Sequence, residues 1–229
     1  MPFIQRAAFV ASLGLLVALL AGLFVRRLYR VCYSFPAYLM AVLAGDVLMF
    51  AWPDRFYTWG FWTVKETLYA LLKLAIAIEV SALAYQAFPS ARAAVRRVIL
   101  GVLAALLAFL VIGVPYDAEL PTLARELQRR TANGIALVFC ATWALVLYYR
   151  LPLHRLHRAI LRGLVPYLLV FASANTLTLV FGWDVRQAVN VADAAAWALM
   201  LAYWCWVVWR PARPDPPFMR QLQRWRARI

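Results

Sequence analysis

The chain has 229 residues, of which 66% are hydrophobic and 15% are aromatic. A soluble domain is about 45–50% apolar, so this excess of apolar side chains excludes a soluble enzyme or binding module and predicts an integral membrane protein. The net charge of +14 does not indicate a nucleic-acid partner, because the basic residues lie in short segments between apolar blocks, as a membrane topology signal requires.

Apolar segments follow one another along the chain, with lengths near the roughly 20 residues that span a bilayer as a helix. The seven segments are Phe3–Val25, Pro36–Trp52, Trp59–Tyr85, Val98–Val114, Thr131–Tyr149, Leu164–Gly182 and Ala188–Trp209. The sequence therefore predicts an all-α bundle of seven transmembrane helices in residues 1–209, in a bacterial cytoplasmic (inner) membrane. Arginines cluster after the first segment rather than before it, which predicts a retained helix and not a cleaved signal peptide.

The charges outside the apolar segments are divided unequally between the two membrane faces. One face, including the C-terminal tail, carries sixteen basic residues and one acid, whereas the other carries six basic residues and five acids. Because arginine and lysine accumulate in cytoplasmic loops, the first face is predicted to be cytoplasmic. The N-terminus is then outside and the C-terminus is in the cytoplasm.

The third segment is unusual because it contains four ionisable side chains. These are Lys65, Glu66, Lys73 and Glu79. A charge at the bilayer centre costs about 2.5–3.5 kcal/mol on insertion scales, so such groups turn toward partners, water or a ligand. The third helix is therefore predicted to be central in the bundle.

Counting residues from the outer loops, at about 1.5 Å each, places six polar side chains at one depth in the outer half of the membrane. They are Asp46, Lys65, Glu66, Asn175, Asn190 and Asp193. Two interpretations stay open. An Asp46–Lys65 pair and a cluster of the other four would form a chamber open to the outside. Either these polar groups are structural and pair with each other to specify helix packing, or the chamber binds a ligand or ion. Lys73 and Glu79 lie deeper and on different faces, so each requires another partner.

A weak internal repeat involves the same residues. Aligning the tyrosines that open the second and sixth segments superposes Asp46 on Asn175. Aligning the third segment on the seventh superposes Glu66 on Asp193. The first and last three helices would then be parallel repeats joined by the fourth, a 3+1+3 plan found in transporters whose sites lie where the repeats meet.

The C-terminal residues 210–229 form a separate region. A proline-rich spacer, RPARPDPP, precedes FMRQLQRWRARI, in which apolar residues recur on one helical face and arginines occupy the remainder. The apolar face consists of Phe218, Leu222, Trp225 and Ile229, and the basic residues include Arg220 and Arg224. This pattern is typical of an amphipathic helix on an anionic cytoplasmic leaflet. A helix in a partner's groove and a disordered basic tail remain alternatives.

Motifs for catalysis or metal binding are weak throughout the chain. His154 and His157 have the spacing of metal ligands, but their basic loop favours an ordinary surface position. The cysteines lack metal-ligand spacing, and no hydrolase or phosphate-binding motif occurs. The sequence therefore predicts no enzyme, no metal site and no cofactor. An intramembrane hydrolase or transferase using Asp46 or Asp193 remains an alternative, as does a lipid, quinone or pigment bound to the aromatic residues of the last segment.

Four stretches, YSFPAYL, WGFWTVKE, SARAAVRR and WCWVVWRP, resemble small seven-helix inner-membrane proteins of acidobacterial and related bacteria. The resemblance implies the seven-helix fold and no activity. The function expected from the sequence is a non-enzymatic accessory or scaffold subunit, with protein partners bound through the aromatic outer surface and the basic tail. The alternative is a small-molecule or ion transporter or receptor that uses the outer polar level.

Overall fold

The computed structural model describes residues 3–85, 101, 120–148, 153–181 and 185–211. Within these ranges the chain is helical and contains no β-strand, which confirms the predicted all-α class. The elements are α1 (Phe3–Val25), the 3-10 helix η1 (Leu28–Arg30), α2 (Ser34–Ala51), α3 (Pro53–Phe56), α4 (Trp59–Tyr85), α6 (Leu120–Tyr148), α7 (Arg155–Phe181) and α8 (Arg186–Trp209).

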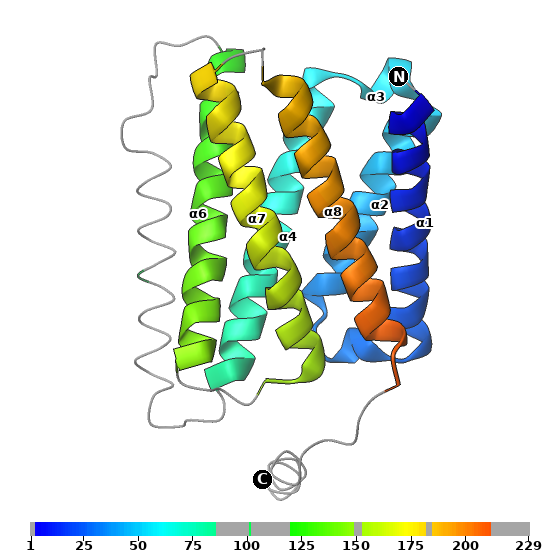
Figure 1. The fold of residues 1–229 in the computed structure, drawn as a ribbon, viewed down its shortest axis with the longest axis vertical. Helices are drawn as coiled ribbons and strands as arrows, with labels where there is room; N and C mark the ends of the chain where they lie inside the picture. The colour runs from blue at the N-terminus through cyan, green and yellow to red at the C-terminus, as the bar shows by residue number, and fades with distance from the viewer. Residues whose placement is uncertain (1–2, 86–100, 102–119, 149–152, 182–184, 212–229) are drawn as a thin grey trace, which may run out of the picture.

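The long helices of the described residues stand roughly parallel to one another (Figure 1) and form a closed ring. Each packs against its neighbours in the order α1, α2, α4, α6, α7 and α8, and α8 packs against α1. Helices α4 and α6 run in the same direction in Figure 1. Residues 86–119 separate them in the chain, so the predicted fourth segment, 98–114, lies outside the described residues apart from residue 101.

Four of these helices are long and apolar enough to span a membrane. The spans are Ser34–Ala51, Glu126–Tyr148, Arg155–Thr178 and Arg186–Trp209. Large apolar side chains also point outward along the helices, for example Leu137 at 69% exposure and Leu199 at 71%. Such extensive apolar surface is abnormal for a soluble monomer. The protein therefore has the character of an integral membrane protein, while the number of seven spans remains a prediction.

Tight packing between α7 and α8 depends on a glycine beside a buried tryptophan. The Trp204 indole is 1% exposed, lies edge-on to Phe35 with ring centroids 4.9 Å apart, and donates from Nε1 to the Ala159 carbonyl at 3.0 Å. A Cβ on Gly163 would overlap that indole nitrogen. Trp204 is therefore a core residue that fixes how closely the two helices approach.

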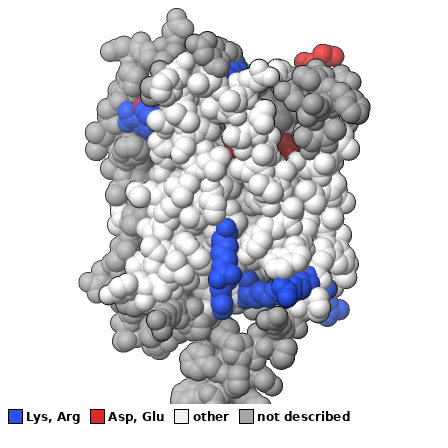
Figure 2. Space-filling view, viewed as in Figure 1, with Lys and Arg blue, Asp and Glu red and all other residues white. Residues whose placement is uncertain are grey.

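Apart from those buried within the helices, the described charged residues lie toward the two ends of the bundle. We call one end the arginine end, because Figure 2 shows basic side chains gathered there; it carries the arginines at 26, 27, 30, 155 and 158. We call the opposite end, which carries α3 and the N-terminus of α8, the α3 end (Figure 1). This separation is what the predicted orientation requires, and assignment of the arginine end to the cytoplasm remains a prediction.

Arginines at the arginine end cap the C-terminus of α8. Arg26 donates to the carbonyls of Trp209 and Arg210 at 2.6 and 2.8 Å. Arg155 donates to the carbonyl of Val207 at 2.6 Å. The last carbonyls of a helix lack intrahelical partners and carry partial negative charge, so guanidinium groups stabilise them. These contacts join α8 to both α1 and α7.

The prediction of a surface position for His157 is wrong. Its side chain is 4% exposed, and its Nε2 lies 3.0 Å from the carbonyl oxygen of Val31. The reason is that α7 begins at Arg155 rather than at the predicted Leu164, which places His157 on the buried face of its first turn. No cluster of metal-ligating side chains occurs among the described residues.

Candidate ligand-binding cavity

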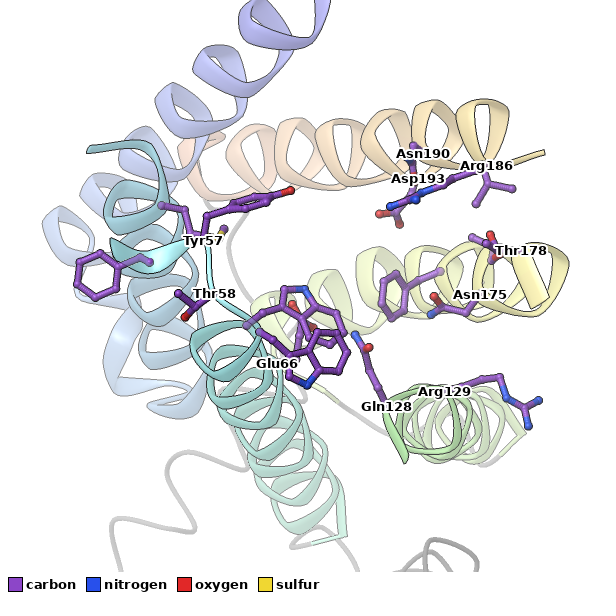
Figure 3. A pocket seen from close by; sticks show the side chains of 17 residues that line it. Tyr57, Thr58, Glu66, Gln128, Arg129, Asn175, Thr178, Arg186, Asn190 and Asp193 are labelled. Atoms are coloured by element: carbon purple, nitrogen blue, oxygen red, sulfur yellow. The ribbon is translucent and has the colours of Figure 1, made fainter. Parts of the chain in front are cut away.

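A cavity of about 720 Å³ lies at the α3 end, between α2, α3, α4, α6, α7 and α8 (Figure 3). Its polar walls come mainly from α4, α6, α7 and α8, and its aromatic walls come from the end of α3, the first turn of α4, the junction between them, and α7. The lining residues are Met49, Phe56, Tyr57, Thr58, Trp59, Trp62, Glu66, Gln128, Arg129, Phe171, Ala174, Asn175, Thr178, Arg186, Val189, Asn190 and Asp193.

Four of the six predicted site residues line this one cavity. Glu66 comes from α4, Asn175 from α7, and Asn190 and Asp193 from α8. Figure 3 shows Glu66, Asn175 and Asp193 directed toward the space that the helices enclose. The sequence argument by depth therefore placed these four residues together. Their role in binding remains a prediction.

The remaining two residues of the predicted level are placed differently. Lys65 forms its salt bridge with Glu66, at 3.5 Å between Nζ and Oε1, and not with Asp46. Neither Lys65 nor Asp46 lines the cavity. Asp46 and Lys65 therefore form no salt bridge, although the charge of Lys65 still acts on Asp46 electrostatically. The ammonium group of Lys65 lies beside the ring of Tyr69, 5.5 Å from its centroid.

Lys73 lies behind the cavity wall and is paired with aromatic rings. Its side chain is 7% exposed, and its Nζ lies 5.8 Å from the Tyr38 ring centroid and 5.5 Å from that of Phe171. Lys73 forms no salt bridge with any described residue. Ring faces attract cations, and the attraction grows when both groups are desolvated. Its partners are therefore ring faces together with the charges of Glu66 and Asp193, which act on it electrostatically.

Glu79 is far from the cavity, at the arginine end. Its carboxylate accepts hydrogen bonds from the backbone amides of Tyr33 and Ser34, both at 2.9 Å, and from the Ser34 hydroxyl. Cys32 donates its thiol to the same carboxylate at 3.4 Å. Burial, followed by the charge of Glu79, raises the pKa of the Cys32 thiol to about 12. Glu79 thus caps the N-terminus of α2 and belongs to a structural cluster.

Aromatic side chains make up the part of the site that the sequence reasoning missed. Phe56, Tyr57, Trp59, Trp62 and Phe171 all line the cavity. The rings of Trp59 and Trp62 stack with centroids 4.9 Å apart and an interplanar angle of 24°. A signal was present in the sequence, because Trp59, Trp62 and Glu66 recur at i, i+3 and i+7 and therefore share one face of α4.

Two buried polar atoms in the cavity walls have no hydrogen-bond partner within the described part of the chain. They are Asn175 Nδ2 and Asp193 Oδ1. In contrast, Arg129 has a carboxylate partner, since its Nε and Nη2 donate to Glu126 at 3.0 and 2.6 Å. Buried polar groups are nearly always satisfied in folded proteins, so these two atoms offer a donor and an acceptor to a molecule bound in the cavity. No other side chain of the described cavity wall forms a hydrogen bond with either atom.

The described lining offers carboxylate, guanidinium, amide, hydroxyl and aromatic groups, which can bind a small molecule by charge, hydrogen bonds and ring contacts. The described residues contain no metal-ligating cluster. No protein-family model, no curated protein and no solved structure matches the chain.

Proposed function

We propose that this integral membrane protein binds a small molecule in the cavity at the α3 end, as a receptor or a transporter. The observation that carries the proposal is the pair of buried, unpartnered atoms, Asn175 Nδ2 and Asp193 Oδ1, in the wall of a cavity of about 720 Å³. Cavities of about 300–1,000 Å³ with aromatic walls and a few convergent polar groups are typical of ligand sites.

The energetics favour a ligand over a purely structural role for these groups. An unsatisfied buried donor or acceptor costs about 1–3 kcal/mol. A structural network would recover that cost by pairing its members, and Asn175 and Asp193 do not pair with each other. A ligand that satisfies both atoms recovers the same free energy on binding.

A cavity-filling variant tests the proposal. Ala174 lines the cavity and is 8% exposed, so Ala174→Leu places extra methyl groups inside it. Ala194→Leu, on the exposed surface of α8, is the matched control. Wild-type protein in detergent is screened by thermal unfolding against a library of polar metabolites. We expect compounds that raise the unfolding temperature of wild type and of Ala194→Leu but not of Ala174→Leu.

Two results would contradict the proposal. One is a screen in which no compound stabilises the wild type. The other is stabilisation that survives unchanged in Ala174→Leu, which would place the binding elsewhere. The accessory or scaffold role expected from the sequence depends on the aromatic outer surface and on the C-terminal tail, of which residues 212–229 lie outside the described residues. That role stays a prediction.

A further inference from the structure

Three arginine side chains lie around the C-terminus of α8, at the end of the bundle opposite the cavity. Arg26 Nη1 and Arg155 Nη1 both donate to the carbonyl oxygen of Arg210, at 2.8 and 3.3 Å. The two nitrogens are therefore at most about 6 Å apart, which is the sum of those two distances. Arg210 places its own guanidinium group over the ring of Trp206, 4.9 Å from the centroid.

No carboxylate of the described residues balances these charges. The acids that form salt bridges within the described ranges, Glu66 and Glu126, lie at the α3 end. The Glu79 carboxylate at the arginine end accepts its hydrogen bonds from the start of α2. Figure 2 shows basic side chains together at the arginine end of the visible face and acidic ones toward the α3 end.

The carbonyls at the end of α8 offset only part of the positive charge. The C-terminus of a helix carries the equivalent of roughly half a negative charge, whereas each guanidinium group carries a full positive one. Like charges this close repel each other, and an anion beside them would remove the repulsion. The cluster therefore has the charge of an anion site.

The guanidinium groups keep donors for such an anion. Arg26 uses its Nη atoms on the carbonyls of Arg210 and Trp209, and Arg155 uses its Nη atoms on those of Val207, Arg210 and Pro211. The Nε–H of each stays unused within the described part of the chain. Guanidinium groups match the spacing of phosphate oxygens, and one phosphate can accept from several arginines.

The position of the cluster selects a lipid over a soluble anion. Helix α8 is long and apolar enough to span a membrane, so its end lies at the level of the lipid headgroups. Trp206 and Trp209 beside the cluster are 56% and 46% exposed, and tryptophan is enriched at that level of a membrane. A phospholipid would place its phosphate on the arginines and its acyl chains along the apolar surface of the helices.

We propose that Arg26, Arg155 and Arg210 bind the phosphate of an anionic phospholipid. Arg26 follows α1, Arg155 begins α7 and Arg210 follows α8, so one lipid headgroup would join the ends of three helices. The site is separate from the cavity at the α3 end, and the inference goes beyond the proposed function without depending on it.

Two lipids with the same acyl chains test the requirement for negative charge. Dioleoylphosphatidylglycerol is the anionic probe and dioleoylphosphatidylcholine is the zwitterionic one. Each is titrated into the full-length protein in a neutral detergent, and the affinity is obtained from the rise of the unfolding temperature with lipid concentration. We expect the anionic lipid to bind at least about tenfold more tightly. Inorganic phosphate at the same concentration should not stabilise the protein.

Variants assign the preference to named side chains. In Arg26→Gln/Arg155→Gln, the preference for the anionic lipid should fall below about threefold. These two arginines also cap α8, so Arg210→Gln serves if the double variant does not fold, with an expected loss of preference of at least about threefold. Arg55→Gln is the matched control, because Arg55 is an exposed arginine at the α3 end that likewise lies over a ring, 5.8 Å from the Phe56 centroid.

Several outcomes would overturn the lipid site. They are equal affinity for the two lipids, a preference that survives in Arg210→Gln and in the folded double variant, and an equal loss of preference in Arg55→Gln. Stabilisation by inorganic phosphate would assign the site to a free ion. A preference that appears only after Asp215→Asn would assign it to a carboxylate of this chain. Loss of the preference in Ala174→Leu would place the lipid in the cavity instead.

Discussion

The contact between Glu79 and the start of α2 leads to a quantitative prediction about stability. Glu79→Ala removes an acceptor that holds the amides of Tyr33 and Ser34 and the Ser34 hydroxyl. Hydrogen bonds to a charged group contribute about 1.5–3 kcal/mol each, which sets an upper limit. Tyr33 is 65% exposed, so water can replace the hydrogen bond that its amide loses. The expected loss of folding free energy is therefore that of a strong helix cap plus one buried hydrogen bond, about 3 kcal/mol.

Glu79→Gln should lower the folding free energy by less, about 1–2 kcal/mol, because glutamine keeps one oxygen acceptor but has no negative charge to strengthen the hydrogen bonds. One kcal/mol shifts the unfolding temperature of a chain of this length by about 2–4 °C. Thermal unfolding followed by tryptophan fluorescence in detergent should therefore show a decrease of about 6–12 °C for Glu79→Ala and about 2–8 °C for Glu79→Gln.

The exposed acid Asp54 supplies the control for this measurement, since Asp54→Asn should change stability by less than about 0.5 kcal/mol. A Glu79→Ala protein that unfolds at the same temperature as Asp54→Asn would refute the reasoning. A double-mutant cycle with Ser34→Ala adds a sharper test. Each single substitution removes the same shared interaction. The stability losses of the two single variants should therefore add up to more than the stability loss of the double variant.

Further predictions concern packing, reactivity and charge. Gly163→Leu should prevent the close approach of α7 and α8 and lower the yield of folded protein, as measured by size-exclusion chromatography. Adding Trp204→Phe, which makes room beside residue 163, should partly restore that yield. Cys32, fully buried with a pKa near 12, should resist maleimide at pH 8 in the folded protein and react after denaturation; equal labelling before and after would argue against its burial. Lys73→Met should unfold at a temperature no lower than wild type, because methionine fills the space between Tyr38 and Phe171 without a buried charge; a marked decrease would show that the ammonium group is essential to the fold.

Composition and segment length were enough to predict an all-α membrane-type fold, because they depend on counts of apolar residues and not on contacts. The depth argument also placed Glu66, Asn175, Asn190 and Asp193 around one cavity. It succeeded because the rise of a helix is nearly constant, so distance from a loop converts directly into height.

Pairing between side chains was not predictable in the same way. The sequence cannot show the rotation of each helix about its axis, and this rotation decides whether Lys65 reaches Asp46 or Glu66. Helix ends were also misjudged where charged residues continue a helix beyond its apolar part. Helix α7 begins at Arg155 and α6 at Leu120, so His157 is buried in a helix and not exposed in a loop.

The closed ring has a consequence for synthesis and insertion. The first helix rests on the last: Trp209 Nε1 donates to the Ala18 carbonyl at 3.1 Å, the Cys205 thiol lies 3.2 Å from the Leu15 carbonyl oxygen, and Arg26 reaches the carbonyls that follow α8. During translation α1 leaves the ribosome before α8, so this seam cannot form until α8 has been made. Until then the helices from α1 to α7 form an open arc, and α8 closes it.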